Sequence, residues 1–253
     1  MHKVILPKYK AISIFLVFAL GYYISNLLRA ITATIFPELT NEFNLSASDL
    51  GLLGGGYFLG FAAAQIPLGY LLDKSGPKKI VSYFLLIAIV GIISFSLSQN
   101  FTSLLLSRIL IGVGVGACLM GPLTAYRVWF QDETQQRANS WMLMTGAIGM
   151  LSSSLPVQFF LPIMGWRLIF VILAILTFFC IVLIIIFIPN WNKANIRNTP
   201  DDNGSLKEVW QNKLFKSLVP MGFFNYGGLF AIQTLWAGPW MIKVSGYTPE
   251  ESA

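Results

Sequence analysis

Residues 168–188, LIFVILAILTFFCIVLIIIFI, form an uninterrupted apolar stretch without one charged side chain. The hydrocarbon core of a bilayer is about 30 Å thick, and a helix needs about 20 apolar residues to cross it. A long, unbroken stretch is typical of a membrane helix, since the strands of membrane β-barrels are shorter and alternate between apolar and polar residues. We therefore expect residues 168–188 to cross a membrane as an α-helix.

The composition of all 253 residues extends this expectation to the whole chain. Hydrophobic residues make up 55% of the sequence and charged residues only 11%, whereas a soluble domain carries roughly 25% charged residues. Such a chain has too few polar side chains to cover a water-facing surface. This excludes a soluble globular enzyme, a disordered chain and a secreted disulfide scaffold.

Further stretches of the chain are also long and apolar enough to span a bilayer. Apart from 168–188, these predicted spans are 11–36, 50–72, 80–97, 104–130, 138–164 and 218–241. The polar residues 189–213 predict a linker between a bundle of six spans, residues 1–188, and a second unit, residues 214–253. We expect an all-α, polytopic membrane helix bundle that is truncated in its second half.

Lysine and arginine are concentrated in connections that alternate along the chain. They gather before residue 11 and in residues 74–79, 127–137 and 193–216. The positive-inside rule places such connections on the cytoplasmic side, which predicts a cytoplasmic N-terminus and a place in the cytoplasmic (inner) membrane. This arrangement also accounts for the net charge of +6 without a nucleic-acid partner.

The turn after the second predicted span reads GYLLDKSGPKK over residues 69–79. Its first glycine allows a close approach of helices, and Gly76-Pro77 makes a tight turn. Asp73 can accept a hydrogen bond from a helix N-terminus or pair with a cation. The segment resembles the loop signature of the major facilitator superfamily, with Pro77 in place of a usual basic residue. The matching positions are Gly69, Asp73, Gly76, Lys78 and Lys79.

Two further segments strengthen this resemblance. RILIGVGVGA over residues 108–117 resembles the arginine-plus-glycine motif of the family's fourth span. GWRLIF over residues 165–170 resembles the Gly-Trp-Arg sequence that members carry between spans five and six. The resemblance implies two six-helix halves around a central cavity, with this chain supplying the first half and one helix of the second. It also implies a pairing of Asp73 with Arg127.

Arg108 lies inside the fourth predicted span, where a buried arginine costs at least ~2.5–3.5 kcal/mol. Two interpretations stay open. The side chain reaches the outer headgroups, about 9 Å away along the helix, or it faces inward in a structural or coupling role, as the motif implies. Gly112 and Gly116 share the face of Arg108 and form a stripe of small residues that favours helix packing.

Tyr22, Asn26 and Arg29 share one face of the first span at positions i, i+4 and i+7. In the family's fold this face lines the central cavity, where Arg29 would bind an anionic substrate. The organophosphate/phosphate exchangers and related organic-anion transporters of the superfamily carry such an arginine, followed eight residues later by a proline, as Pro37 follows Arg29. The alternative is that Arg29 pairs with backbone or reaches outward.

The seventh predicted span adds two candidates for the cavity wall, Gln233 and Trp236. Taken singly, each is better explained by a helix–helix hydrogen bond or an interfacial aromatic. The predicted spans contain no histidine, aspartate or glutamate in their interiors. This argues against an intramembrane enzyme, so we predict no catalytic residue, no metal site and no cofactor.

The leading functional hypothesis is a secondary transporter that moves a small anionic solute, an organic anion or a phosphate ester, through the bilayer by alternating access. A coupling ion is compatible with this hypothesis, although the spans offer no buried carboxylate for a proton relay. The alternatives are a transporter-like solute sensor and an inactive, truncated fragment of a transporter.

Overall fold

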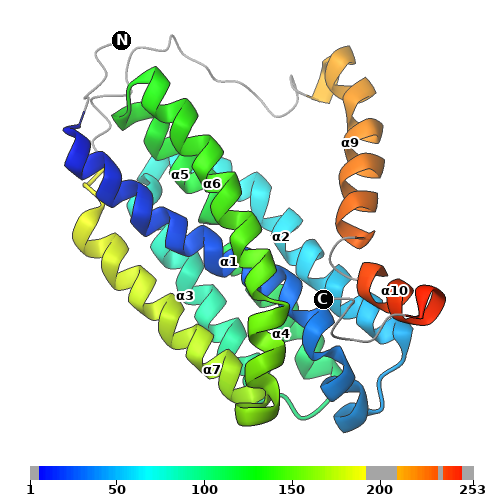
Figure 1. The fold of residues 1–253 in the computed structure, drawn as a ribbon. Coiled ribbons are helices and arrows are strands. Elements are labelled where there is room, and N and C mark those ends of the chain that lie inside the picture. The colour runs from blue at the N-terminus through cyan, green and yellow to red at the C-terminus, as the bar shows by residue number, and fades with distance from the viewer. Residues whose placement is uncertain (1–5, 192–209, 233–235, 247–253) are drawn as a thin grey trace. The chain divides into compact units, whose positions relative to one another are not determined.

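The computed structural model describes residues 6–191, 210–232 and 236–246, and all secondary structure in these ranges is helical (Figure 1). The all-α class predicted from the apolar stretches is therefore confirmed. The chain divides into two compact units, residues 2–195 and residues 196–253. The division falls inside the predicted linker 189–213.

The helices of the first unit follow one another with short connections. In chain order they are α1 (Lys8–Phe43), α2 (Ala47–Ser75), α3 (Pro77–Ser96), α4 (Phe101–Val115), α5 (Ala117–Trp129), α6 (Asp132–Ser152) and α7 (Leu155–Phe187). Within this unit α1 packs mainly against α6 and α7, and α4 packs against α2 and α3 (Figure 1). The second unit contains α9 (Lys213–Ala231) and α10 (Ala237–Ser245).

Five helical segments of the described chain are long and apolar enough to cross a membrane: α1, α2, α3, the α4–α5 segment and α7. The predicted span 138–164 falls instead on α6 and the first part of α7, which are separated by a turn at Ser153 and Ser154. The predicted span 218–241 falls on α9 and α10, with residues 233–235 outside the described ranges.

Polar side chains and a glycine set several helix boundaries. The Ser46 backbone N–H donates to the Asp49 carboxylate at 2.7 Å, and the Ser46 hydroxyl caps the start of α2 in return. At the start of α4, the Asn100 side chain accepts from the Ser103 backbone N–H at 2.9 Å. These caps satisfy N–H groups that a helix leaves unpaired. Gly165, with a φ of 72°, makes the turn inside α7 that separates the fifth and sixth predicted spans.

Glycines let α4 lie directly against α2 and α3. A Cβ at Gly112 would overlap the carbonyl oxygen of Tyr57, and a Cβ at Gly114 would overlap the backbone of Ala88. Gly116 follows the last residue of α4, and a Cβ there would lie 3.2 Å from Gln65 Nε2 on α2. The stripe formed by Gly112 and Gly116 therefore lies in a helix contact, because only small residues allow backbones to approach so closely.

Residues 69–79, at the end of α2 and the start of α3, have only some of the contacts expected from the sequence. Gly76 has a φ of 78° and makes the turn into α3. Gly69, in contrast, is exposed, and a Cβ there would meet no atom within 4 Å, so the expected close approach of helices is not found there. Asp73 and Arg127 form no ion pair within the described part of the chain, and both side chains are exposed.

Contacts at one end of the first unit join its basic connections. The Leu6 backbone N–H donates to the Trp129 carbonyl at 3.2 Å, which ties the chain's beginning to the end of α5. The rings of Trp129 and Trp191 pack edge to face at 5.8 Å, and Trp191 in turn covers Gly76. The lysine- and arginine-rich segments flanking these residues therefore lie at the same end of the bundle.

A polar cluster that the sequence analysis did not predict joins α1, α3 and α7 at the other end. Trp166 Nε1 donates to the Glu42 carboxylate at 3.0 Å, and Arg167 Nη1 donates to the same oxygen at 2.8 Å. Arg167 also donates to the Ser98 carbonyl at 3.2 Å and lies over the Trp166 ring at 4.2 Å. Trp166 and Arg167 of the Gly-Trp-Arg segment thus bind the last turn of α1 through Glu42.

Acidification should weaken this cluster. The hydrogen bond from Arg167 holds the pKa of Glu42, which lies beyond the predicted span 11–36, below its usual 4.5. Because the folded-state pKa is depressed, the stabilisation is present above the unfolded pKa and is lost as pH falls through the folded value. We expect Glu42→Gln to lower the Tm by about 1–3 °C near neutral pH, since a half-exposed ion pair contributes about 1 kcal/mol or less.

Thermal unfolding in detergent, followed by intrinsic fluorescence from about pH 7 to about pH 3, measures this effect. The difference between wild type and Glu42→Gln should shrink as pH falls. Glu38→Gln removes the same charge from the same helix and is the matched control. A pH-independent difference, or an equal loss in Glu38→Gln, would contradict the assignment.

The glycine contacts make a second prediction. Gly112→Ala should lower the Tm by several degrees, because its Cβ would overlap the Tyr57 carbonyl oxygen and force α2 and α4 apart. Gly69→Ala should leave the Tm unchanged or raise it, because its Cβ enters open space and alanine favours the helix by about 1 kcal/mol. The comparison uses the same thermal scan. The interpretation fails if both alanine variants unfold at the same temperature.

Candidate functional site

The site centres on Arg108, which α4 directs inward against α1. Its Nη1 donates to the Leu28 carbonyl at 2.8 Å and its Nη2 to the Arg29 carbonyl at 3.4 Å. The side chain is only 1% exposed. The structure thus decides between the two interpretations left open by the sequence, in favour of the inward one. Backbone carbonyls provide the acceptors, since each has a second lone pair beyond its helical hydrogen bond.

Two aromatic rings of α2 lie beside the arginines. Tyr57 and Phe61 are one helical turn apart, with ring centroids 6.4 Å apart and planes inclined by 15°. The Arg108 guanidinium carbon lies 4.8 Å from the Tyr57 centroid, and that of Arg29 lies 5.5 Å from the Phe61 centroid. Such cation–π contacts stabilise a positive charge away from water. The pair therefore places two guanidinium groups along one face of α2.

Tyr57 also fastens α2 to α1. Its hydroxyl donates to the Ser25 carbonyl at 3.4 Å, one turn before the carbonyls that Arg108 reaches. The middle of α1 thus accepts hydrogen bonds from α2 and from α4. Because these groups are buried, the contacts fix the position and rotation of α1 at the level of Arg29.

Two guanidinium groups bring positive charge to this site. Arg29 is partly buried and Arg108 fully buried, while no aspartate or glutamate lies in the interior of the predicted spans. In the described chain Arg108 forms no ion pair, and the carboxylate of Glu42 is bound by Arg167 at the end of α1. A low-dielectric environment strengthens the attraction of such a site for an anion. The described residues contain no cluster of three metal-ligating side chains.

Tyr22 and Asn26 do not lie on an open surface with Arg29. Asn26 Nδ2 donates to the Tyr22 carbonyl at 2.9 Å, and both residues are buried. They pack on Gly146 of α6, where a Cβ would lie 2.9 Å from Asn26 Nδ2 and 2.5 Å from the Tyr22 ring. Within the described first unit these two residues are therefore covered, and their part in substrate binding stays a prediction. Gly146 lets α6 approach and cover these two residues, which the periodicity of α1 cannot reveal.

The remaining candidates are placed in different parts of the chain. Gln233 lies outside the described residues. Trp236 belongs to the second unit, where it precedes α10 and is exposed. Their part in a cavity with Arg29 stays a prediction. Sequence analysis missed Tyr57 and Phe61, whose spacing of four residues was the available signal.

Residues 18–253 match the family model described as Major Facilitator Superfamily. The chain belongs to the major facilitator superfamily. This is a family of membrane transporters and not of enzymes, so the predicted absence of enzymatic activity agrees with the family.

Relatives of this superfamily member include transporters of anions. It is 26% identical to the probable L-galactonate transporter of Escherichia coli (strain K12), over 78% of this chain and 43% of the relative. It is 26% identical to the nitrate/nitrite transporter NrtP of Nostoc punctiforme, over 80% of this chain and 41% of the relative. The probable sulfoacetate transporter SauU of Cupriavidus necator is 27% identical, over 62% of this chain and 36% of the relative. The chain spans less than half the length of these relatives.

Solved structures show the superfamily fold in this chain. A bacterial homolog of the human lysosomal transporter Spinster, in an inward-facing and unoccupied conformation, aligns with a TM-score of 0.75 at 20% identity. This alignment covers 98% of the present chain and 58% of the Spinster homolog. A D-xylose–proton symporter aligns with a TM-score of 0.70 at 18% identity, over 95% of this chain and 64% of the symporter.

The contact of Arg108 with α1 predicts an unequal effect of two conservative substitutions. Arg108→Lys should lower the Tm by several degrees, because an ammonium group cannot reach both carbonyls and stack on Tyr57 at once. Arg137→Lys, at an exposed position of α6, should leave the Tm nearly unchanged. Thermal unfolding in detergent measures both. Equal Tm values for Arg108→Lys and wild type would show that the two carbonyl contacts contribute little.

Proposed function

We propose that this chain forms part of a secondary transporter for a small organic anion, and that Arg29 binds the anionic group. The observation that carries the proposal is the placement of Arg29 beside the buried Arg108, on a face of α2 with no acidic side chain in the neighbouring spans. Relatives named as transporters of L-galactonate, nitrate and sulfoacetate support it, since all three solutes are anions.

Arg29 has the chemistry that this role requires. A guanidinium group presents a planar fork of N–H donors that matches carboxylate, sulfonate and phosphate oxygens, and such charge-assisted hydrogen bonds are strong and oriented. Arg29 is partly buried, and Arg108 is enclosed at 1% exposure. We assign anion binding to Arg29 and a positioning role to Arg108, which holds the α1 backbone at Arg29 itself.

The transport cycle would follow the general mechanism of this class of carrier. The two halves rock around a site near the middle of the bilayer, so that the site opens to each side in turn. The spans of the described unit offer no interior carboxylate, so a proton relay through them is not part of the proposal. A phosphate ester remains within the proposed substrate class, since its charge and oxygen geometry suit the same fork of donors.

The orientation is part of the same proposal. The end of the bundle that gathers the basic connections would face the cytoplasm, and the N-terminus would lie on that side of the cytoplasmic membrane. The contacts among Leu6, Trp129 and Trp191 support this, because they hold those connections at one end.

Substitution of Arg29 tests the proposed site. In the natural full-length protein reconstituted in liposomes, radiolabelled L-galactonate, sulfoacetate and nitrate serve as probes of uptake. Arg29→Gln should reduce uptake of the transported anion at least about tenfold, since loss of a buried charge partner costs about 2–5 kcal/mol. Arg29→Lys should retain part of the activity because the charge remains.

Arg137→Gln removes one exposed arginine at the basic end of the bundle and is the control for net charge. Unchanged uptake by Arg29→Gln would refute the assignment of the anion site. Because the liposomes contain no partner protein, sustained flux would also separate a carrier from a solute sensor.

A further inference from the structure

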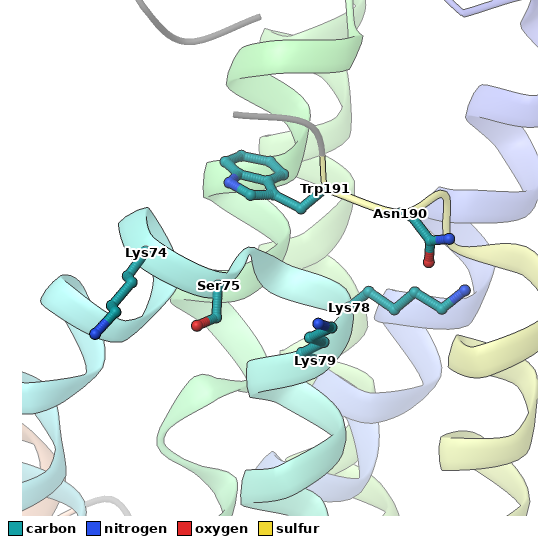
Figure 2. Close-up of a pocket in the computed structure, with 6 residues that line it drawn as sticks. All are labelled: Lys74, Ser75, Lys78, Lys79, Asn190 and Trp191. Carbon is teal, nitrogen blue, oxygen red and sulfur yellow. The ribbon is translucent and has the colours of Figure 1, made fainter. Parts of the chain in front are cut away.

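A cavity of about 460 Å³ lies at the basic end of the first unit, outside the site described above. It is bounded by the turn between α2 and α3 on one side and by the residues that follow α7 on the other (Figure 2). Its lining residues are Lys74, Ser75, Lys78, Lys79, Asn190 and Trp191. None of them has a part in the proposed transport site.

The walls of the cavity are held by aromatic packing on a glycine turn. Gly76 has a φ of 78°, and a Cβ at this position would overlap the indole of Trp191. Trp129 at the end of α5 packs edge to face on Trp191 at 5.8 Å. The absence of a side chain at Gly76 therefore lets the Trp191 indole pack on the turn. This contact places the neighbouring Asn190 opposite the lysines of the turn.

The polar groups at this cavity suit an anion. Figure 2 shows Lys78 extending toward Asn190, while Lys74 extends away from both, where its ammonium lies 5.7 Å from the Tyr70 ring. Within the described chain none of the three lysines forms an ion pair, and the nearby carboxylate of Asp73 is exposed. Lys78 and Lys79 therefore leave two positive charges at the cavity without an acidic partner in the described chain, and such charges attract a negative group.

The start of α3 adds to the positive potential. α3 begins at Pro77, and no side chain caps its N-terminus. The backbone N–H groups of Lys78 and Lys79 belong to the first turn, which has no acceptors within its own helix. The positive end of the helix dipole therefore lies at the turn that carries Lys78 and Lys79.

We propose that this cavity binds the phosphate group of an anionic membrane lipid. A phosphate offers several acceptor oxygens for Lys78, Lys79, Ser75 and the Asn190 amide, and a cavity of this volume admits a headgroup-sized ligand. The lipid is favoured over a free phosphate because Trp191 lines the cavity and Tyr70, which Lys74 contacts, is 67% exposed. Trp and Tyr are enriched at the depth of lipid headgroups.

The proposal does not depend on the identity of the transported solute. It depends only on this end of the bundle lying at a membrane surface, where basic pockets between helices bind anionic headgroups. A bound headgroup would join the α2–α3 turn to the end of α7. The lipid would then stabilise the contact of Gly76 with Trp191, which the protein itself holds only by packing.

Native mass spectrometry of the chain in detergent, titrated with phosphatidylglycerol or with phosphatidylcholine, tests the proposal. Wild type should retain phosphatidylglycerol in preference to phosphatidylcholine. The double variant Lys78→Ala with Lys79→Ala should bind phosphatidylglycerol at least about tenfold more weakly, because both side-chain charges are removed. Lys78→Arg with Lys79→Arg keeps the charges and should retain most of the binding.

The matched control removes two exposed lysines from the same end of the bundle, Lys8→Ala with Lys10→Ala, and should change the affinity less than about twofold. Equal weakening by both alanine pairs would overturn the proposal, because it would indicate diffuse attraction to a basic surface. Equal retention of the two lipids by wild type would overturn it as well. Circular dichroism of each variant shows whether it is still folded. The charge-retaining arginine variant gives a second check that weaker binding does not come from loss of fold.

A competition experiment distinguishes a lipid headgroup from free phosphate as the ligand of this cavity. Inorganic phosphate added to the lipid-bound protein should fail to displace phosphatidylglycerol if the acyl chains and the aromatic residues contribute to binding. Displacement by inorganic phosphate from wild type would support a phosphate site but overturn the lipid as its ligand.

Discussion

The described bundle depends on how the Arg108 guanidinium is accommodated inside it. An arginine at this depth is costly unless its donors find acceptors. Here the carbonyls of Leu28 and Arg29 accept two of its hydrogen bonds, and the Tyr57 ring lies against its face. These contacts require α1, α2 and α4 to converge at one level. The same convergence sets Arg29 beside Phe61, so the structural arginine and the proposed anion-binding arginine share one arrangement.

Close backbone approach makes this convergence possible. Gly112 and Gly114 let α4 lie against α2 and α3 with no side chain between them. Gly146 does the same for α6 against α1, and it encloses Tyr22 and Asn26 in doing so. In a membrane there is no hydrophobic drive to press helices together, so packing of small residues and buried hydrogen bonds provides the association. The glycines thus control which polar side chains are enclosed and which stay accessible.

The two ends of the first unit use different chemistry. At one end, Trp166 and Arg167 of α7 bind the Glu42 carboxylate of α1. Arg167 also donates to the Ser98 carbonyl after α3, so the ion pair links these three helices. At the other, lysines surround a cavity and have no acidic partner in the described chain. A compensated cluster stabilises the fold by itself, whereas uncompensated charge is available for a ligand. This difference separates the structural end of the unit from the end proposed to bind lipid.

The sequence by itself determined the helical class, the membrane setting and the superfamily, because long apolar stretches and the 69–79 motif are local features of the chain. It also drew attention to Arg29 and Arg108, since charges are rare inside spans, and to the glycine stripe, since small residues favour helix packing.

Only the tertiary structure decided what these residues contact. The inward direction of Arg108, the burial of Tyr22 and Asn26, and the open surroundings of Gly69 all depend on which helix lies alongside. Helical periodicity gives the face of a residue but not its neighbour across the interface. That neighbour is set by long-range packing between segments far apart in the sequence.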